Sequence, residues 1–255
     1  MLAALGRAVL ALLAFVGDVM TLLAEALSFL IRGRIGARRT IDQMAVAGTD
    51  SLPITALTLV LVGMAGSWHT ATFMVRLGAT DYIGGASSIA VARELGPALC
   101  GVVVAARVGA AYAAELGTMA VTEQVDALRA LAISPAYYLV LPRLIACAVM
   151  LPLLTVVADA SGIFGAYLLS SHFGISRAVF MTSIQQWLTP HDVYGGVAKA
   201  FFFGIIIALV GCRQGLRTGG GAAGVGRATI SAVVLSIILI YAANMALTAA
   251  IYGNR

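Results

Sequence analysis

The stretch from residue 93 to residue 131 constrains the fold most, because an apolar run of bilayer length there carries four charges. These charged side chains are Arg93, Glu94, Arg107 and Glu115. A charge inside such a run is costly unless it faces another polar group or a water-filled cavity. Residues 122–131 then become amphipathic, which predicts a short helix outside the membrane. The combination indicates a chain that passes force or substrate across a membrane.

The composition predicts an all-α integral membrane protein. Apolar residues make up 61% of the chain and charged residues 11%, whereas soluble domains have about 25% charged residues. The mean hydropathy is +0.99. The net charge of +5 does not indicate a nucleic-acid partner, since a basic excess in membrane proteins usually collects in cytoplasmic loops.

Apolar runs of about 20 residues mark bilayer crossings. We predict one domain over residues 1–255 with five spans, at about residues 52–75, 87–118, 137–169, 193–211 and 228–252. Gly96-Pro97 should bend the second span. A short helix on the outer surface is expected over residues 176–188, capped by Ser176 and ended by Pro190.

Residues 2–32 carry one narrow polar stripe on an otherwise apolar helix. Its members are Arg7, Asp18, Thr21, Glu25, Ser28 and Arg32. This pattern favours an amphipathic helix that lies in the plane of the membrane interface. A sixth span is the alternative interpretation of the same residues.

The arginines predict the orientation. In the five-span arrangement, one side of the membrane receives Arg32, Arg34, Arg38, Arg39, Arg129, Arg143, Arg213, Arg217 and Arg227. The other side receives Arg76, Arg177 and Arg255. Because positive charge collects in the cytoplasm, we expect a cytoplasmic N-terminus and an external C-terminus.

The amphipathic segment 122–131 connects the second and third spans on the expected cytoplasmic side. Thr122 should cap this helix, with Val125 and Leu128 on its apolar face and Asp126 on its polar face. One interpretation is a surface helix within a loop. The other is a coupling helix that docks into a cytoplasmic motor subunit.

Five motifs together resemble the MlaE/YrbE permeases, the membrane subunits of Mla- and Mce-type ABC lipid transporters. They are RELGP at 93–97, AARVGA at 105–110, AELGTM at 114–119, EQVDAL at 123–128 and GVGRAT at 224–229. The resemblance covers about residues 38–253. Two positions depart from the family pattern: Asn244 replaces a common acid, and His69 replaces a common glutamine.

The resemblance implies a homodimeric phospholipid permease, with five spans and an interfacial helix, in a bacterial inner membrane. It implies that an ABC ATPase, which holds ATP and magnesium, docks at the coupling helix. The coupling residues would be Glu123, Gln124, Asp126, Leu128 and Arg129. An MCE-domain protein would bind on the periplasmic side, and a STAS-domain subunit is a further candidate partner.

The cargo site is expected among three charged residues, Arg93, Glu94 and Lys199. Arg93 and Lys199 would hold an anionic headgroup through charge-assisted bonds. The alternatives are a self-neutralising Arg93–Glu94 pair and a Lys199 that extends to the interface. Arg107, Glu115 and Asp159 are expected to be intramembrane structural supports. Arg107 and Glu115 should point into the bundle, and Asp159 should pair with an arginine or a hydroxyl.

The sequence indicates no catalytic site and no metal site. The three histidines lack paired ligand spacing, and the glycine-rich segment 219–224 does not follow a strand, which argues against a dinucleotide site. The three cysteines are interpreted as packing residues. Two other functions stay open: an intramembrane lipid-modifying enzyme, and a scaffold that anchors an envelope complex without transport.

Overall fold

The computed structural model describes residues 2–33 and 36–253, which form helices and contain no strand. Arg34 and Arg255, used above for orientation, lie outside the described residues. The α-helices are α1 Leu2–Ile31, α2 Ala37–Ala47, α3 Leu52–Arg76, α4 Ile83–Ala90, α5 Gly96–Val104, α6 Ala110–Val121, α7 Gln124–Ala130, α8 Leu141–His172, α9 Arg177–Trp187, α10 Pro190–Leu216 and α11 Gly221–Tyr252. π-helical segments cover Val91–Leu95, Ala105–Gly109 and Ala136–Val140.

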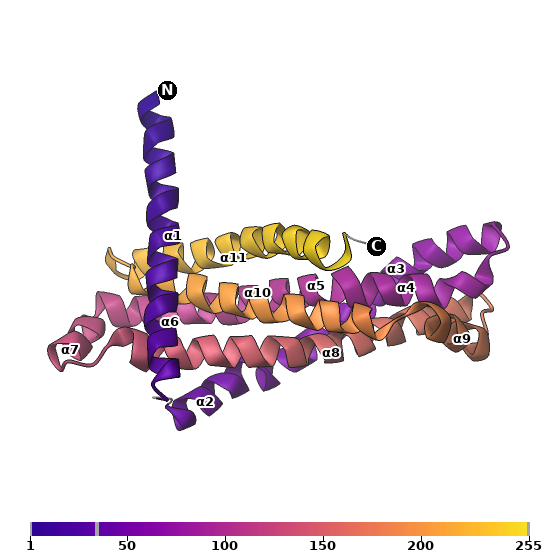
Figure 1. Ribbon diagram of the computed structural model, residues 1–255, viewed down its shortest axis with the longest axis horizontal. Helices are drawn as coiled ribbons and strands as arrows, with labels where there is room; N and C mark the ends of the chain where they lie inside the picture. The colour runs from indigo at the N-terminus through magenta and orange to yellow at the C-terminus, as the bar shows by residue number, and fades with distance from the viewer. Residues whose placement is uncertain (1, 34–35, 254–255) are drawn as a thin grey trace.

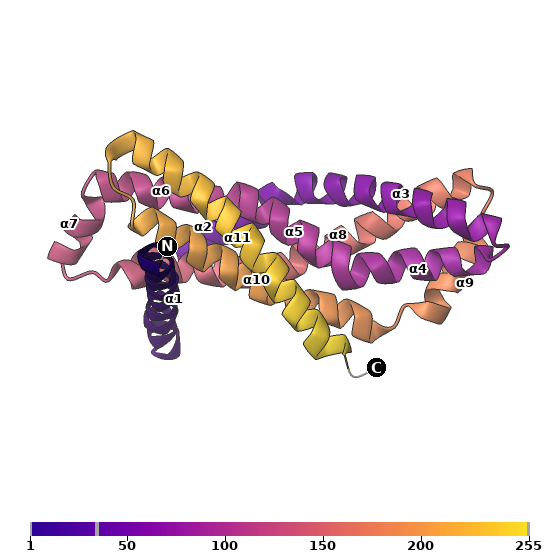
Figure 2. The ribbon, with the colours of Figure 1, turned by 90° about the horizontal axis from the view of Figure 1, so that it is seen from above.

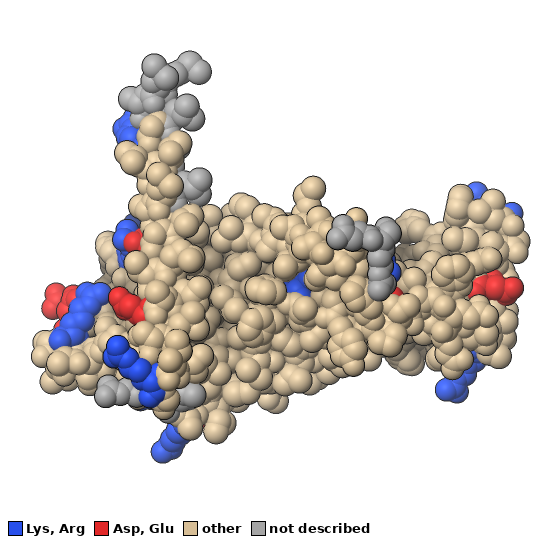
Figure 3. Space-filling model, viewed as in Figure 1, with Lys and Arg blue, Asp and Glu red and all other residues tan. Residues whose placement is uncertain are grey.

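The long helices form an elongated bundle with α7 at one end and α9 at the other (Figures 1 and 2). Among the described residues, six stretches are long and apolar enough to cross a membrane. Five of them contain the five predicted spans, so the chain is a multi-pass membrane protein. Most charged side chains in Figure 3 lie toward the two ends, and the face between them is mostly uncharged.

Helix α1 runs across the long axis of the bundle instead of along it (Figure 1). An interfacial helix would have this direction if the other helices cross the bilayer along that axis. Residues Leu13–Ile31 are also apolar enough to be a sixth span. The polar stripe faces the protein in part, because Asp18 accepts hydrogen bonds from Arg213 of α10 and from Arg217, which directly follows α10.

The second span is longer than predicted and is helical from Thr80 to Val121. Its beginning is stabilised by α9, since the backbone N–H of Gly85 donates to Ser183 Oγ at 2.9 Å. Gly84 lies so close to the Phe180 carbonyl that a Cβ would collide with it. The predicted bend takes the form of a π-helical segment, Val91–Leu95, immediately before Gly96-Pro97. Such segments often mark functional positions in helices.

In the outer region, one boundary agrees with prediction and one differs. Ser176 caps α9 as expected, accepting from the Val179 N–H at 3.3 Å. The helix ends with Leu188 as its C-terminal cap, which agrees with the predicted range of 176–188. Pro190 begins α10, where Thr189 and Asp192 form a reciprocal capping box. The fourth span therefore starts three residues earlier than the hydropathy pattern indicates.

Close backbone approach holds α3 against α8. A Cβ on Gly63 would collide with the Gly162 carbonyl, and one on Gly165 would collide with the Val60 carbonyl. Small residues at such contacts let membrane helices pack closely. The three cysteines are free and buried, as expected of packing residues.

Candidate functional site

One face of α10 packs against the π-helical segment Val91–Leu95. Asp192, Gly196 and Lys199 share this face because they recur at intervals of four and three residues. Gly196 lies directly against the Ala92 carbonyl, where a Cβ would not fit. Pro97 has no N–H, so the Arg93 carbonyl cannot receive the α-helical bond from four residues later. Lys199 Nζ donates to that carbonyl at 2.8 Å.

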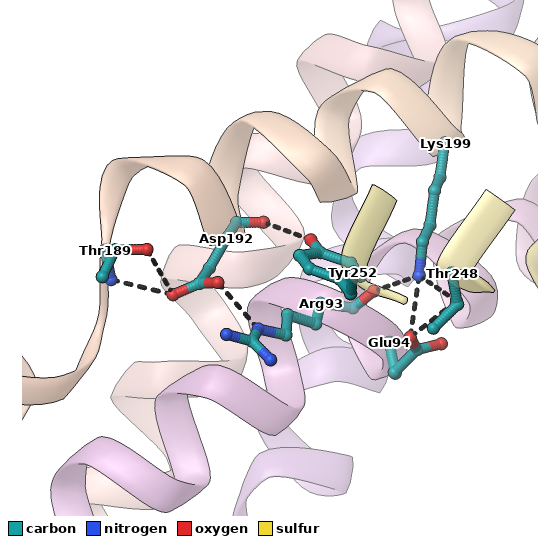
Figure 4. A network of polar contacts seen from close by, with 7 residues as sticks. All are labelled: Arg93, Glu94, Thr189, Asp192, Lys199, Thr248 and Tyr252. Carbon is teal, nitrogen blue, oxygen red and sulfur yellow. Dashed lines mark hydrogen bonds and ion pairs between the residues drawn. The ribbon is translucent and has the colours of Figure 1, made fainter. Parts of the chain in front are cut away.

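Lys199 is fully buried and has three acceptors around its ammonium group (Figure 4). Besides the Arg93 carbonyl, Nζ donates to Glu94 Oε1 at 2.8 Å and to Thr248 Oγ1 at 2.6 Å. An ammonium group has three protons to donate. These three acceptors match that number, and the Glu94 carboxylate neutralises the charge in an apolar bundle.

Glu94 connects this part of the second span to α11. Its Oε1 accepts from Lys199 and from the Thr248 hydroxyl at 2.8 Å. Its Oε2 accepts from Asn244 Nδ2 at 2.6 Å. Asn244, one of the two departures from the family pattern, therefore supplies a donor at a position where a second carboxylate would repel Glu94.

Arg93 has a different partner, the buried carboxylate of Asp192. Arg93 Nε donates to Asp192 Oδ1 at 2.7 Å, and the arginine side chain keeps 34% of its surface exposed. Its guanidinium also lies 4.7 Å from the centre of the Tyr252 ring. Asp192 Oδ2 accepts from the backbone and hydroxyl of Thr189, so the α10 cap and the Arg93 ion pair share one carboxylate.

This geometry corrects the expectations for Arg93, Glu94 and Lys199. Arg93 and Glu94 lie in one network, but neither neutralises the other, since each has its own counter-ion. Lys199 neither extends to the interface nor faces an open cavity, because its side chain has no exposed surface. Of the two cations expected to hold a headgroup together, only Arg93 reaches the surface.

Four further members of this network were not predicted from the sequence: Asp192, Thr189, Thr248 and Tyr252. The Tyr252 hydroxyl donates to the Asp192 carbonyl at 3.2 Å. The pattern of Thr189 followed three residues later by an acid is a capping-box signal that could have revealed Asp192. Thr248 carried no comparable signal, because its partner lies 154 residues away in the chain.

Arg107 and Glu115 do not contact the network. Arg107 donates to the Val46 carbonyl at 2.9 Å and to Ser51 Oγ at 2.8 Å. Glu115 pairs with the buried Arg143 at 2.7 Å. Each has a polar partner as expected, but Glu115 does not point into the bundle, because 54% of its side chain is exposed.

Asp159 contradicts the expectation that it pairs with an arginine or a hydroxyl. It is 5% exposed. Within the described part of the chain, neither of its carboxyl oxygens has a hydrogen-bond partner. It packs against Gly96, where an added Cβ would collide with Oδ1. The structure thus brings a buried carboxyl against the bend in the second span.

The short helix expected over residues 122–131 is present as α7, which protrudes from the bundle (Figure 1). Thr122 does not cap it, because its hydroxyl donates back to the Thr118 carbonyl at 2.8 Å. The capping position belongs to Glu123, whose φ of 62° is left-handed, so the helix does not run on from the second span without a break. Val125 is buried, whereas Leu131 is 71% exposed.

The other expected coupling residues are mostly exposed on α7. Glu123, Gln124, Asp126 and Arg129 are exposed, and Leu128 is half-buried. Arg129 Nη1 donates to Asp126 Oδ1 at 2.8 Å within the helix. No group of three potential His, Cys, Asp or Glu metal ligands occurs among the residues that the structure describes.

Comparisons with known proteins agree with this architecture. The family model described as Permease MlaE matches residues 40–250. The chain is 44% identical to a probable ABC transporter permease of Synechocystis, over 86% of this chain and 84% of that protein. It is 42% identical to one from Rickettsia prowazekii, over 88% and 86%.

A third relative is the chloroplast protein TRIGALACTOSYLDIACYLGLYCEROL 1 of Arabidopsis thaliana, which is 41% identical over 86% of this chain. The match spans 63% of that longer protein. The family match and the sequence identities together show a closer relationship than a similar fold alone. The chain belongs to the MlaE permease family, whose members are membrane-spanning permease subunits of ABC transporters and are not themselves catalytic.

Proposed function

We propose that the chain is the permease of an ATP-driven transporter that moves phospholipid or a related lipid between the inner membrane and the cell envelope of a bacterium. Two copies would enclose the lipid, and a separate cytoplasmic ATPase would bind ATP and magnesium. An MCE-domain protein would receive or deliver lipid on the periplasmic side. A plant relative named after a galactolipid supports the cargo class.

The observation that carries this proposal is the partial exposure of Arg93 beside an apolar helix face. Its ion pair with Asp192 uses Nε, and 34% of the side chain stays exposed. A guanidinium can bind a phosphate oxygen while it keeps a carboxylate partner, because it has five N–H donors. The first contact with a headgroup is therefore assigned to Arg93, with Lys199 fixing the backbone beneath it.

The apolar half of the cargo site would come from α11 and a second chain. Large side chains at intervals along α11 are exposed: Ile230, Val234, Ile238, Tyr241 and Met245. The cavity between the second span and α3, lined by Ser87, Val91 and Leu95, measures only about 50 Å³. Sites for drug-sized ligands occupy about 300–1,000 Å³. A chamber that holds a lipid would form between two copies, against the exposed apolar face of α11.

Helix α7 is the proposed contact for the ATPase. Left-handed residues stand on both sides of it, with φ values of 62° at Glu123 and 58° at Ala132. These turns hold a protruding helix at a defined angle to the bundle. ATP can drive transport only if lipid affinity differs between the states before and after nucleotide binding. Movement of α7 would change the packing of the second span, which carries Arg93.

Reconstitution with the ATPase tests the function. We expect a tagged chain to co-purify an ATPase whose hydrolysis is stimulated by lipid, and a photo-reactive lipid to label the wild type near Arg93. Arg93→Gln should weaken labelling while the complex still assembles, and Arg177→Gln on α9 is the matched charge control. Lipid turnover by the chain alone would favour the enzyme, and assembly without lipid-stimulated hydrolysis would favour the scaffold.

A further inference from the structure

A second polar site lies at the α7 end of the bundle, where α1, α7 and α10 meet. A cavity of about 180 Å³ there is lined by three arginines, one acid, one threonine and two leucines. The lining includes Arg129, Arg213, Arg217, Asp18, Leu22 and Leu216. It is far along α10 from Lys199, so it does not belong to the network around Arg93.

The charges of this cavity do not balance. Arg213 donates to Asp18 through Nε at 3.1 Å and Nη2 at 2.8 Å, and Arg217 Nη2 donates to the other oxygen of the same carboxylate. Arg129 pairs with Asp126. Asp126 does not itself line the cavity, so its pairing with Arg129 brings the count to three guanidinium groups and two carboxylates, which leaves one positive charge. A single-charge anion would complete the site.

Donors for such an anion remain on Arg129 and Arg217. Their side chains are 62% and 58% exposed. Within the described residues, each makes its hydrogen bonds through one terminal nitrogen only. Arg213 is more fully used, since Nη1 also donates to Gln214 Oε1 at 3.3 Å. The two outer arginines would bind the ligand, and Arg213 would hold Asp18 and α1 in place.

We propose that this cavity binds the phosphate headgroup of an anionic lipid in the leaflet at the α7 end. Planar guanidinium groups match phosphate oxygens, and basic pockets between helices at the membrane surface bind anionic headgroups. Apolar surface is supplied by Leu22 and Leu216, which line the same cavity beside the arginines. This apolar surface suits an acyl chain and would be of no use to free phosphate.

Such a lipid would bridge the interfacial helix, the coupling helix and the fourth span. Because Arg129 belongs to α7, an occupied site would restrain the helix proposed to bind the ATPase. The inference needs neither Arg93 nor the identity of the transported lipid, so its test is separate from that of the proposed function.

The test measures lipid retention by the full-length chain without any ATPase. The chain is purified from nanodiscs of phosphatidylcholine with added phosphatidylglycerol, and retained lipid is counted by native mass spectrometry. We expect Arg217→Gln to retain roughly tenfold less phosphatidylglycerol than wild type. Arg217→Lys should lose less, and Arg177→Gln, at the opposite end, should behave as wild type.

Arg129→Gln provides a second variant of the same cavity, which keeps the test decisive if Arg217→Gln does not fold. Unchanged retention in the folded variants, or an equal loss in Arg177→Gln, would overturn the site. A second arm adds inorganic phosphate to nanodiscs of phosphatidylcholine alone. Bound phosphate that survives there, and displaces phosphatidylglycerol when both are present, would overturn the assignment to a lipid.

Discussion

Lys199 Nζ lies 2.8 Å from the carbonyl oxygen of Arg93, the oxygen that Pro97 deprives of its usual helical donor. A side chain of the fourth span thus supplies the hydrogen-bond donor that a backbone carbonyl of the second span lacks. The same ammonium neutralises Glu94, so the bend and the charge are stabilised by one residue.

Lys199→Met should destabilise the protein by about 2–4 kcal/mol, because it leaves the Glu94 carboxylate and the Arg93 carbonyl without their donor. Lys199→Met/Glu94→Gln should be more stable than the sum of the two single changes. Thermal unfolding in detergent measures both. Strict additivity would show that the two residues do not interact.

Asn244→Asp should be more destabilising than Asn244→Ala. The alanine variant loses one hydrogen bond to Glu94, whereas the aspartate places a like charge where Asn244 Nδ2 now donates at 2.6 Å. The expected difference is about 1–2 kcal/mol, measured by unfolding at neutral pH. Equal stability of the two variants would mean that Glu94 can turn away from position 244.

Asp192→Ala should cost more stability than Thr189→Ala. Both changes remove the cap of α10, which is worth about 0.5–2 kcal/mol. Only the aspartate change also removes the counter-ion of Arg93. Unfolding temperatures of the two variants, compared with Arg93→Gln, separate the two contributions. The prediction fails if both variants lose the same amount.

Ala132→Gly should stabilise α7 by about 1 kcal/mol, because glycine adopts a φ of 58° without steric cost. The residue ends the helix in a Schellman-type turn, in which the Ile133 N–H donates to the Leu128 carbonyl at 2.9 Å. Ala127→Gly, inside α7, should have the opposite sign. Hydrogen exchange of α7 amides measures both, and equal signs would contradict the expectation.

Gly96→Ala should destabilise the protein strongly, since the new methyl group would collide with Asp159 Oδ1. Gly96→Ala/Asp159→Ala should recover part of the loss. The recovery cannot be complete, because the Val91 carbonyl oxygen would also lie 3.0 Å from the new Cβ. Expression yield and unfolding temperature report both effects, and no recovery would place the strain elsewhere.

The spans were predictable because each is a long apolar run, and their limits were less so. The fourth span begins at Pro190 through a capping box that hydropathy does not detect. Segment 122–131 has the right amphipathic pattern, yet a left-handed Glu123 separates α7 from the second span. A single sequence gives no sign of that backbone conformation at a glutamate.

The charged residues of the site were recognisable, but their partners were not. Arg93, Glu94 and Lys199 were notable as charges in apolar runs. Their contacts join the second, fourth and fifth spans across about a hundred residues or more. Helix rotation and crossing decide such pairs, and periodicity within one helix does not contain that information. Asp159 shows the limit clearly, since an intramembrane acid suggested a partner that the described residues do not provide.

The glycine contacts between α3 and α8 restrict how the bundle can change shape. Gly63 and Gly165 bring the two backbones into contact at points three residues apart on each helix. Sliding one helix past the other would drive a side chain into a backbone carbonyl. Helices α3 and α8 therefore have to move together as one rigid unit. Any rearrangement during a transport cycle must then be a movement of the remaining helices relative to the α3–α8 pair.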